Sequence, residues 1–328
     1  MREAYVPMAL KNEILQQLEQ NRGRDLSGEE LARAAGVTRA AVWKAVTSLR
    51  RDGYHILSGT NKGYRLKEDD DRLSPDAIRA YLPAGTELDI RVFETLDSTN
   101  NEAKRIAVGG VTGPVLILAE EQTAGRGRLG RSFYSPAGTG LYLTLLYRTR
   151  DSLAKTVPIT SAAAVAVTET IEALTDKHPG IKWVNDVYLN GKKICGILTE
   201  AVTDMESGDV QNVIVGIGLN VSTDAFPEEL RERAASLFPE GVSRSRFAAE
   251  IASRLLLYAK ELDRRTFLGT YRSHSILTGR EITYRRNDVL HGGTVIGIDK
   301  DCGLMVRRPD GNVEVLRTGE VTVRLKED

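Results

Sequence analysis

A segment rich in glycine and arginine is the first place in the chain where residue types and spacing indicate chemistry. It reads Glu120-Glu121-Gln122-Thr123-Ala124-Gly125-Arg126-Gly127-Arg128-Leu129-Gly130-Arg131. Glycines permit a close backbone approach to a ligand, and arginines offer permanent planar charges that suit carboxylate and phosphate oxygens. It lacks the spacing of a P-loop. The segment predicts an anion site, although a solvated basic loop or an RNA-contacting segment would have the same composition.

Three further segments place polar or small residues where a strand or helix is expected to begin or end. They are Asp97-Ser98-Thr99-Asn100, Lys182-Trp183-Val184-Asn185-Asp186 and Gly216-Ile217-Gly218-Leu219-Asn220. Each has an ordinary structural alternative. The hydroxyls of the first could cap a helix, the lysine of the second could be a solvated strand-end residue followed by a turn, and the last asparagine could cap the chain leaving a strand.

Together the four segments resemble the motifs of the biotin–protein ligase family, which are DSTN, a GRGRxGR loop, KWPND and GxGxN. The resemblance extends over nearly the whole chain, and a helix-turn-helix head narrows it to the bifunctional branch, the biotin operon repressors. Two positions depart from the pattern: Val184 replaces the usual proline, and Phe133 stands where a tryptophan often lies near the nucleotide. Neither departure removes a charge, so we expect altered packing and retained activity.

The resemblance implies a two-step reaction, in which biotin and ATP give biotinyl-5′-adenylate and a lysine of an acceptor protein then attacks it. The carboxylate of biotin is ionised at pH 7, so the first step needs positive charge around the phosphates and no general base. Lys182, Arg126 and Arg128 are the expected catalytic residues. The expected biotin-binding residues are Ser98, Thr99, Asn100, Gln122, Arg126, Gly127, Arg128 and Lys182. The expected ATP-binding residues are Arg128, Arg131, Phe133, Lys182 and Asn220, with Mg²⁺ accompanying the triphosphate and no separate metal site.

Residues 1–67 are predicted to form a winged helix-turn-helix domain. Leu10, Ile14, Leu15 and Leu18 mark one face of a first helix. Ser27-Gly28-Glu29-Glu30 is a capping box that starts a second helix, which Gly36 ends, and Thr38 can cap a third. A hairpin around residues 59–63 follows as the wing. The segment holds 12 Lys and Arg against 7 Asp and Glu, a net charge of +5 within a chain whose total is zero.

The exposed face of the third helix is expected to contact DNA. Burial of Val42, Val46 and Leu49 would leave the basic side chains and Trp43 free to reach bases or phosphates. The residues expected to contact DNA are Ser27, Arg39, Ala40, Trp43, Lys44, Thr47, Arg50 and Lys62. A helical interaction module with solvated charges, or a head that has lost DNA binding, are the alternatives.

The remaining chain is predicted to contain a linker with a short helix at 68–83, a ligase core at 84–273 and a small SH3-like β-barrel at 274–328. Strands are expected at 115–119, 141–147, 187–189, 194–200 and 213–219, and long helices at 154–174 and 247–267. Five short strands are expected after residue 275. The fold class is thus α+β multidomain, and the resemblance implies a central mixed α/β core like that of class II aminoacyl-tRNA synthetases and biotin–lipoyl ligases.

Composition limits the remaining function classes. The two cysteines, Cys195 and Cys302, lie far apart and form no metal-ligand pattern. No apolar run reaches the length that spans a bilayer, and we expect a cytoplasmic protein without a membrane partner. The expected partners are a biotin carboxyl carrier protein or domain, operator DNA and a second copy of the chain when the adenylate is bound. A ligase for another acid such as lipoate and a non-enzymatic ligand-sensing regulator are the competing hypotheses.

Overall fold

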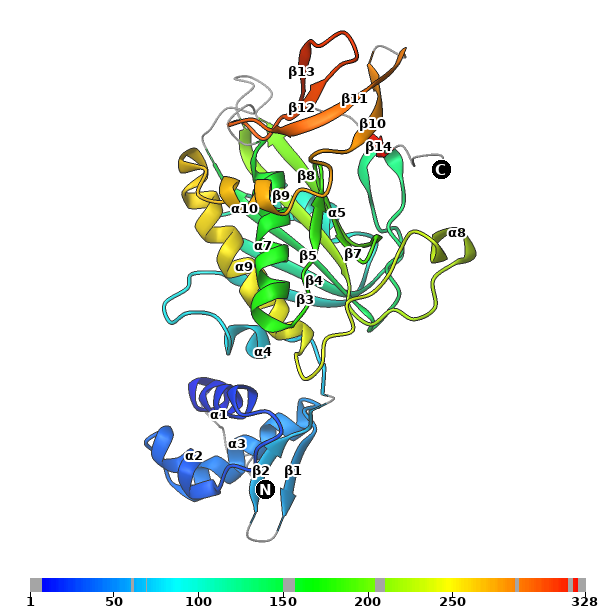
Figure 1. The fold of residues 1–328 in the computed structure, drawn as a ribbon. Helices are drawn as coiled ribbons and strands as arrows, with labels where there is room; N and C mark the ends of the chain where they lie inside the picture. Colours follow the sequence, from blue (N-terminus) through cyan, green and yellow to red (C-terminus); the bar gives the residue numbers. More distant parts are fainter. Residues whose placement is uncertain are drawn as a thin grey trace. The chain divides into compact units, whose positions relative to one another are not determined.

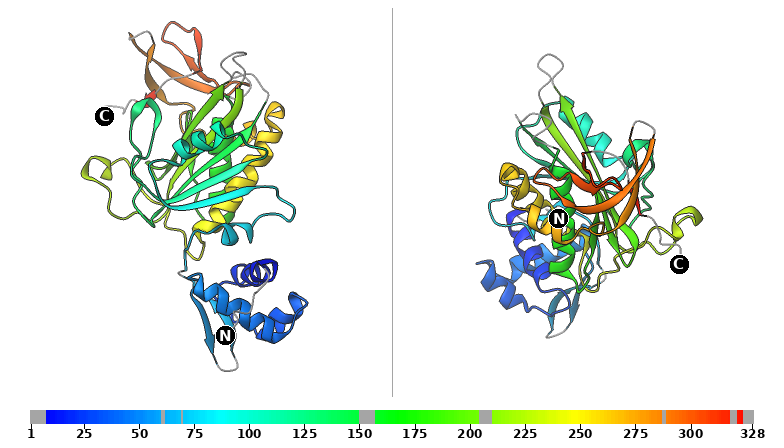
Figure 2. Two further views of the ribbon diagram at one scale, coloured as in Figure 1. Left: turned by 180° about the vertical axis from the view of Figure 1, so that it is seen from behind. Right: turned by 45° about the horizontal axis from the view of Figure 1, so that its top comes forward.

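A computed structural model describes residues 8–59, 62–68, 70–149, 157–203, 210–286, 289–317 and 321–323. The chain divides into two compact units. One comprises residues 1–86 and 240–250, and the other comprises residues 87–239 and 251–328. Figures 1 and 2 show the elements of each unit. No helix in the described part of the chain is long and apolar enough to cross a membrane.

The first unit begins with three helices and a two-stranded hairpin. The helices are α1 (Met8–Gln20), α2 (Gly28–Ala34) and α3 (Arg39–Arg51), and the strands are β1 (Ile56–Gly59) and β2 (Gly63–Leu66). The predicted capping box is present, because Ser27 Oγ accepts from Glu30 N at 3.0 Å and Glu30 Oε2 accepts from Ser27 N at 2.7 Å. Thr38 caps α3 as predicted. Two residues of the predicted turn, Thr60 and Asn61, lie outside the described residues.

The three helices pack around one apolar core. Its buried side chains come from α1, α2, α3 and both strands, and they include Ile14, Leu31, Val46, Leu49 and Leu66. Each full burial of such a side chain stabilises the fold by about 1.5–3 kcal/mol. The unit continues into α4 (Pro75–Arg79), where Ser74 is the predicted cap and Pro75 the first helical residue. Arg244 Nε donates to Asp71 Oδ2 at 2.7 Å and ties residues 240–250 to this unit.

The second unit is built on a seven-stranded mixed sheet with the order β3-β4-β5-β9-β8-β7-β6. The strands are β3 (Asp89–Leu96), β4 (Val115–Gln122), β5 (Gly140–Arg148), β6 (Gly180–Lys182), β7 (Asp186–Leu189), β8 (Lys192–Thr203) and β9 (Val210–Asn220). β3 and β4 are parallel, and every other neighbouring pair is antiparallel. The predicted turn at Asn190 and Gly191 joins β7 to β8, and both residues have positive φ, as a tight hairpin turn requires.

Helices cover both faces of this sheet, as Figures 1 and 2 show from opposite sides. On one face, α5 (Thr99–Val108) packs Ala103 and Ala107 against β4, β5 and β9. On the other face lies α7 (Ile159–Leu174), which is buried along most of its length. Residues 154–156 of the predicted helix lie outside the described residues. α8 (Glu228–Arg231) follows the sheet in the chain.

The predicted helix at 247–267 is shorter and starts earlier than expected. α9 spans Arg244–Lys260, a 3-10 turn covers Leu262–Arg264, and α10 spans Leu268–Ser273. Arg265 adopts a left-handed conformation, with φ of 53°, so the α-helix cannot run through it. The apolar pattern of the sequence continues across this break, because Leu262 before it and Phe267 after it are both buried. The sequence therefore predicted one helix where the structure has two.

The C-terminal region forms a five-stranded antiparallel sheet with the order β13-β12-β11-β10-β14. Its strands are β10 (Glu281–Arg286), β11 (Val289–Ile298), β12 (Leu304–Arg307), β13 (Val313–Leu316) and β14 (Val321–Val323). Among the described residues β13 and β14 are the two edges of the sheet, so the predicted barrel is present here as a small sheet without closure. Trp183 Nε1 donates to Cys302 O at 2.9 Å and joins this sheet to the core.

Candidate active site

A cavity of about 720 Å³ lies against β8 and β9 of the seven-stranded sheet and gathers residues from all four motifs found in the sequence. Its size suits a ligand of nucleotide or drug dimensions. Six basic side chains line it, namely Arg126, Arg128, Arg131, Lys182, Lys193 and Arg233, against one acidic side chain, Asp186, which gives a net of +5. This excess of positive charge favours a phosphate-bearing or carboxylate-bearing ligand.

The Gly/Arg segment forms a closed loop along one side of the cavity. Gly127 N donates to Arg131 O at 2.7 Å, and Phe133 N donates to Gly125 O at 2.9 Å, so the two ends of the loop pair like a short hairpin. A 3-10 turn at 128–130 contains Leu129 with φ of 56° and reverses the chain. A Cβ at Gly125 would lie 2.3 Å from Phe133 O, so only glycine permits this pairing.

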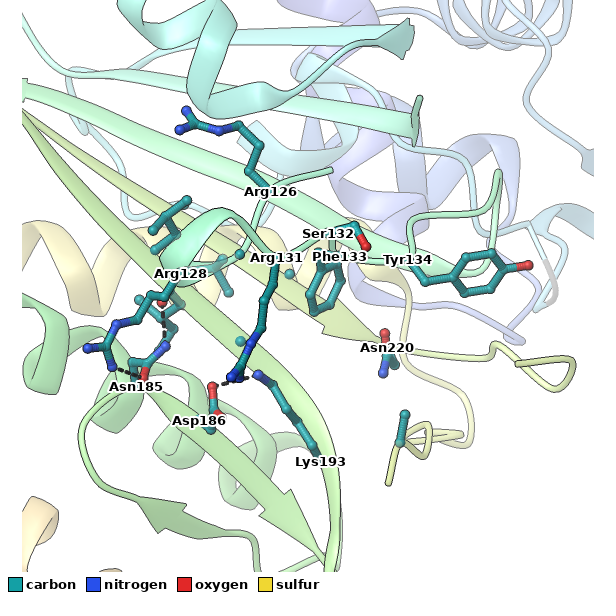
Figure 3. Close-up of a pocket in the computed structure, with 18 of the residues that line it drawn as sticks. Arg126, Arg128, Arg131, Ser132, Phe133, Tyr134, Asn185, Asp186, Lys193 and Asn220 are labelled. Atoms are coloured by element: carbon teal, nitrogen blue, oxygen red, sulfur yellow. Dashed lines mark hydrogen bonds and ion pairs between the residues drawn. The ribbon is translucent and has the colours of Figure 1, made fainter. Parts of the chain in front are cut away.

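The loop sends its arginines in different directions, as Figure 3 shows. Arg128 Nη1 donates to Asn185 Oδ1 at 2.8 Å. Asn185 is itself fixed, because its Nδ2 donates to Ile197 O at 2.8 Å. Arg126 points away from Arg128 and Arg131, and its Nη1 lies 3.1 Å from both Asn101 Oδ1 and Glu200 Oε1.

Lys193 is paired with a carboxylate inside the cavity. It lies on β8, opposite β7, and its Nζ is 2.6 Å from Asp186 Oδ1 (Figure 3). Lys182, at the end of β6, also lines the cavity, and its Nζ lies 5.7 Å from the centre of the Tyr188 ring. The antiparallel strands β6, β7 and β8 thus bring Lys182 and Lys193 to one cavity, although only Lys182 belongs to one of the four motifs.

The two glycines of the β9 motif each make room for another side chain of the site. A Cβ at Gly216 would lie 2.1 Å from Asn100 Oδ1, and a Cβ at Gly218 would lie 2.6 Å from a ring carbon of Phe133. The Phe133 ring therefore rests directly on the backbone of β9. This explains in physical terms why small residues occupy alternate positions of a buried strand.

The end of the cavity near α5 is neutral and polar. Gln122 Oε1 accepts from Thr99 N at 2.9 Å, and Gln122 Nε2 donates to Ser135 Oγ at 2.9 Å. Ser98 stands at the start of α5 but its hydroxyl makes no capping hydrogen bond. The cavity therefore has one end suited to a neutral polar ring and one end suited to phosphates.

Asp97 holds the start of this polar end in place. Burial opposes ionisation of its carboxyl group, but hydrogen bonds from Asn101 and Arg105 outweigh it and lower the pKa of Asp97 to about 2. Asn101 Nδ2 and Arg105 Nη2 each lie 2.8 Å from Asp97 Oδ2.

Comparison with known proteins agrees with the motifs. Residues 92–220 match the biotin/lipoate A/B protein ligase family, and residues 11–65 match a helix-turn-helix domain. The bifunctional ligase/repressor BirA of Bacillus spizizenii is 33% identical over 311 residues, which cover 92% of this chain and 95% of that protein. The chain belongs to the bifunctional biotin ligase and repressor family.

Further members of the family give the same picture. BirA of Escherichia coli is 29% identical over 92% of this chain and 94% of its own length. A biotin protein ligase from Aquifex aeolicus, solved in complex with biotin and ATP, superposes with a TM-score of 0.60 at 27% identity, over 72% of this chain and 98% of that one.

In this member of the family, the residues expected to bind biotin and ATP all line the one cavity. They are Ser98, Thr99, Asn100, Gln122, Arg126, Gly127, Arg128, Arg131, Phe133, Lys182 and Asn220. Two assigned roles need a second interpretation. Both hydrogens of the Asn100 amide are used, since Nδ2 donates to Leu198 O and Glu200 Oε2. Asn220 Nδ2 donates to Ala235 O at 3.1 Å and fixes the segment after β9.

Sequence reasoning missed several residues of the cavity. Lys193, Arg233, Phe226 and Tyr134 line it but belong to none of the four motifs. Asn185 and Asp186 were interpreted as turn residues; they do flank a turn, and they also face the cavity. The cue for Lys193 was its place just after the Asn190-Gly191 turn, which sets it opposite Tyr188 on β7.

The residues expected to contact DNA lie mostly on the exposed side of the head. Arg39, Ala40, Trp43, Lys44 and Lys62 are exposed, and Trp43 is 58% exposed, which is unusual for so large an apolar side chain. Arg50 Nε already donates to Ile56 O at 2.9 Å, and Thr47 Oγ1 donates to Trp43 O at 2.8 Å. The hydroxyl oxygen of Ser27 is used in the capping box.

Val184 and the two cysteines lie among groups that explain their local structure. The peptide bond between Trp183 and Val184 is cis. Tyr271 donates its hydroxyl hydrogen to Val184 O at 3.0 Å. Burial raises the pKa of Cys195 and of Cys302. In the described part of the chain no group of three His, Cys, Asp or Glu residues could hold a metal ion.

Proposed function

We propose that the chain joins biotin to ATP as biotinyl-5′-adenylate, transfers the biotinyl group to a lysine of an acceptor protein and represses transcription when the adenylate remains bound. The observation that supports the ligase activity is one cavity that has a neutral polar end and six basic side chains in its lining. Membership of a family that contains ligases solved with biotin and ATP agrees with this reaction.

The neutral end suits the ureido ring of biotin, because Ser98, Thr99 and Gln122 offer both donors and acceptors there. The basic end suits the triphosphate. Between them, the biotin carboxylate attacks the α-phosphorus, a bond forms between the carboxylate oxygen and phosphorus, and pyrophosphate leaves with its electron pair. Phe133, in contact with Gly218, offers an apolar ring to the adenine or ribose.

The charges that build up in this step determine which side chains act. Arg128, oriented by Asn185, and Lys182, at the end of β6, would bind the α-phosphate and the reacting carboxylate. Arg131 and Lys193 would bind the outer phosphates. The carboxylate of Asp186 is an oxygen ligand that Mg²⁺ accepts alongside phosphate oxygens, and the ion supplies further positive charge to the leaving group. Fixed donors of this kind need no reorganisation during the reaction.

In the second step an acceptor lysine attacks the mixed anhydride and releases AMP. The acceptor is proposed to be a biotin carboxyl carrier protein or domain. The lysine must arrive as a neutral amine to be a nucleophile, so transfer should increase with pH in the range below the pKa of a free lysine, about 10.4. A cytoplasmic location, as expected from the sequence, agrees with an acceptor enzyme and operator DNA as partners.

The decisive test is to incubate the protein with biotin, ATP and Mg²⁺ and to look for biotinyl-adenylate by native mass spectrometry. A complex whose mass has increased by that of the adenylate supports the proposal. Lipoate and octanoate in place of biotin test the alternative substrates, since the matched family model includes lipoate ligases. Pyrophosphate release with lipoate and none with biotin would overturn the choice of substrate.

The head is proposed to bind operator DNA through α3 and the wing, using the exposed Arg39, Trp43, Lys44 and Lys62. Two copies joined as a dimer would read a palindromic operator. If the adenylate favours the dimer, linkage requires that operator affinity increases with biotin and ATP present. Equal operator affinity with and without both substrates would contradict this coupling.

The domain boundaries are also proposals. We assign residues 1–67 to the DNA-binding domain, 68–83 to the linker with α4, 84–273 to the ligase core and 274–328 to the C-terminal domain. Closure of the C-terminal sheet into an SH3-like barrel, and the likeness of the core to class II aminoacyl-tRNA synthetases, stay predictions.

A further inference from the structure

Glu200 lies outside the four motifs, yet it is the meeting point of three side chains from two of them and from α5. It stands on β8, and its side chain is 19% exposed. Lys104 Nζ lies 2.7 Å from Oε1, Asn100 Nδ2 lies 2.9 Å from Oε2, and Arg126 Nη1 lies 3.1 Å from Oε1. Burial opposes ionisation of this carboxyl group, but the hydrogen bonds from Lys104 and Asn100 outweigh it and lower its pKa. Glu200 is therefore an ionised anchor for its neighbours.

One of those neighbours is the first arginine of the Gly/Arg loop. Arg126 donates to Glu200 and to Asn101, and Figure 3 shows it directed away from the arginines that face Asn185 and Asp186. Its charge is thus balanced by the protein itself. The loop begins at a fixed point on β8, and Arg128 follows two residues later with a partner of its own.

A second neighbour, Asn100, extends the anchor beneath the polar end of the cavity. Thr144 Oγ1 donates to Asn100 Oδ1 at 2.7 Å and lies 2.8 Å from Thr99 Oγ1. Thr99 Oγ1 lies 3.1 Å from Gln122 Oε1. Gln122 Nε2 reaches Ser135, whose Oγ donates to Phe133 O at 3.0 Å.

The hydrogen bonds therefore form one continuous path from the start of the loop to its end. The path runs from Arg126 through Glu200, Asn100, Thr144, Thr99, Gln122 and Ser135 to Phe133. Thr144 at its centre is fully buried, so its hydroxyl group has no water to replace a lost partner. A ligand that bonds to Thr99 or Gln122 adds to this same path.

We propose that Glu200 is a positioning residue which, through Asn100 and Arg126, fixes the Gly/Arg loop relative to the biotin end of the cavity. Arg126 acts in this arrangement as the loop's anchor on Glu200. The proposal rests on the ligase function proposed above. Loss of the anchor should loosen the loop that covers the adenylate, so the bound intermediate should leave faster.

The test is a double-mutant cycle on the dissociation rate of preformed biotinyl-adenylate, with the variants Glu200→Gln, Arg126→Met and both together. Each single variant should increase the rate about ten- to hundred-fold, which is the effect of losing one hydrogen bond between charged groups. The double variant should dissociate no faster than Glu200→Gln alone, because that variant already removes the link to Arg126. Additive effects would show that Arg126 contacts the adenylate directly and would overturn the proposal.

Lys104→Met is the matched control. It removes the other cation from the same carboxylate, at a shorter distance of 2.7 Å, without touching the loop. Its dissociation rate should stay near that of the wild type, even if its melting temperature falls as much as that of Glu200→Gln. An equal increase in the dissociation rate for Lys104→Met and Glu200→Gln would show that Glu200 only stabilises the structure locally.

Failure of this inference is distinguishable from failure of the proposed function. If the unaltered chain forms no biotinyl-adenylate, the ligase function is wrong. If it forms the adenylate and Glu200→Gln retains it at the wild-type rate, only the role of Glu200 is wrong.

Discussion

Two lysines compete for the role of holding the reacting carboxylate and α-phosphate, and replacing each by methionine separates them. Sequence motifs assign the role to Lys182. We favour Lys182, because Lys193 Nζ is already paired with Asp186 at 2.6 Å inside the cavity, whereas the nearest described partner of Lys182 is the Tyr188 ring at 5.7 Å. Methionine keeps most of the side-chain volume and removes only the charge.

The expected loss follows from electrostatics. A unit charge acting at about 4 Å with an effective dielectric constant of about 20 contributes about 4 kcal/mol. Removing a single donor aimed at developing charge costs about 10²- to 10³-fold in rate. Lys182→Met should therefore lower the rate of adenylate formation by about 10²- to 10³-fold. Lys193→Met should lower the rate less, because the charge of Lys193 is already balanced by Asp186.

The assay is single-turnover formation of biotinyl-adenylate, followed by pyrophosphate release. Lys192→Met is the matched control, because it removes a lysine charge from β8, and Lys192 Nζ donates to Arg231 O at 2.8 Å, a pair of residues that does not line the cavity. Its rate should equal that of the wild type. A Lys182→Met variant within about threefold of the wild type, beside a Lys193→Met variant that is inactive, would refute the preference for Lys182.

Three further outcomes test other parts of the structure. Gly218→Val should weaken ATP binding and leave biotin binding unchanged in calorimetry, because its Cβ would lie 2.6 Å from the Phe133 ring. The control Gly113→Ala, with open space around its Cβ, should bind ATP and biotin as the wild type does. The carboxyl group of Asp97, whose pKa is lowered to about 2, stabilises the fold above pH 4 and loses that contribution as the pH falls toward 2. The unfolding free energies of wild type and Asp97→Asn should accordingly converge over that range in urea titrations, and a constant difference would contradict the assignment. Trp43→Ala should weaken operator binding in fluorescence anisotropy without changing ligase activity, and equal affinity would exclude Trp43 from the interface.

The elements predicted best from the sequence are those whose capping or turn residues agree with the periodicity of the apolar residues. Ser27 and Glu30 form the expected capping box, and Asn190-Gly191 forms the expected hairpin turn. In both cases the signal lies within four residues, so no long-range packing is needed to interpret it. The break at Arg265 was missed because the buried residues on either side of it keep a helical spacing although the backbone does not.

Long-range pairing explains what the sequence could not indicate in the active site. Lys193 faces the cavity because β7 and β8 pair as a hairpin, with a register shift between Val187 and Tyr188, and no short motif encodes that register. Glu200 reaches Asn100, one hundred residues earlier in the chain, only because β8 lies next to β9 in the sheet under α5. The parallel pairing of β3 with β4 could not be predicted from the sequence either, because a helix separates the two strands in the chain.

The two arginines of the GRGR sequence have different partners in the structure, although they belong to one motif. Arg126 and Arg128 are separated by one glycine and would be assigned the same anion-binding role by residue type. The loop pairs Arg126 with Ser132 as in a strand and then turns sharply through Arg128–Gly130, so the side chains diverge. Arg126 meets a carboxylate of the protein, and Arg128 meets the neutral amide of Asn185. The ion pair with Glu200 must be broken before Arg126 can bind a phosphate, so Arg126 is better suited to anchor the loop than to bind the adenylate. Arg128, which lines the cavity on the turn of the same loop, stays the proposed ligand of the adenylate.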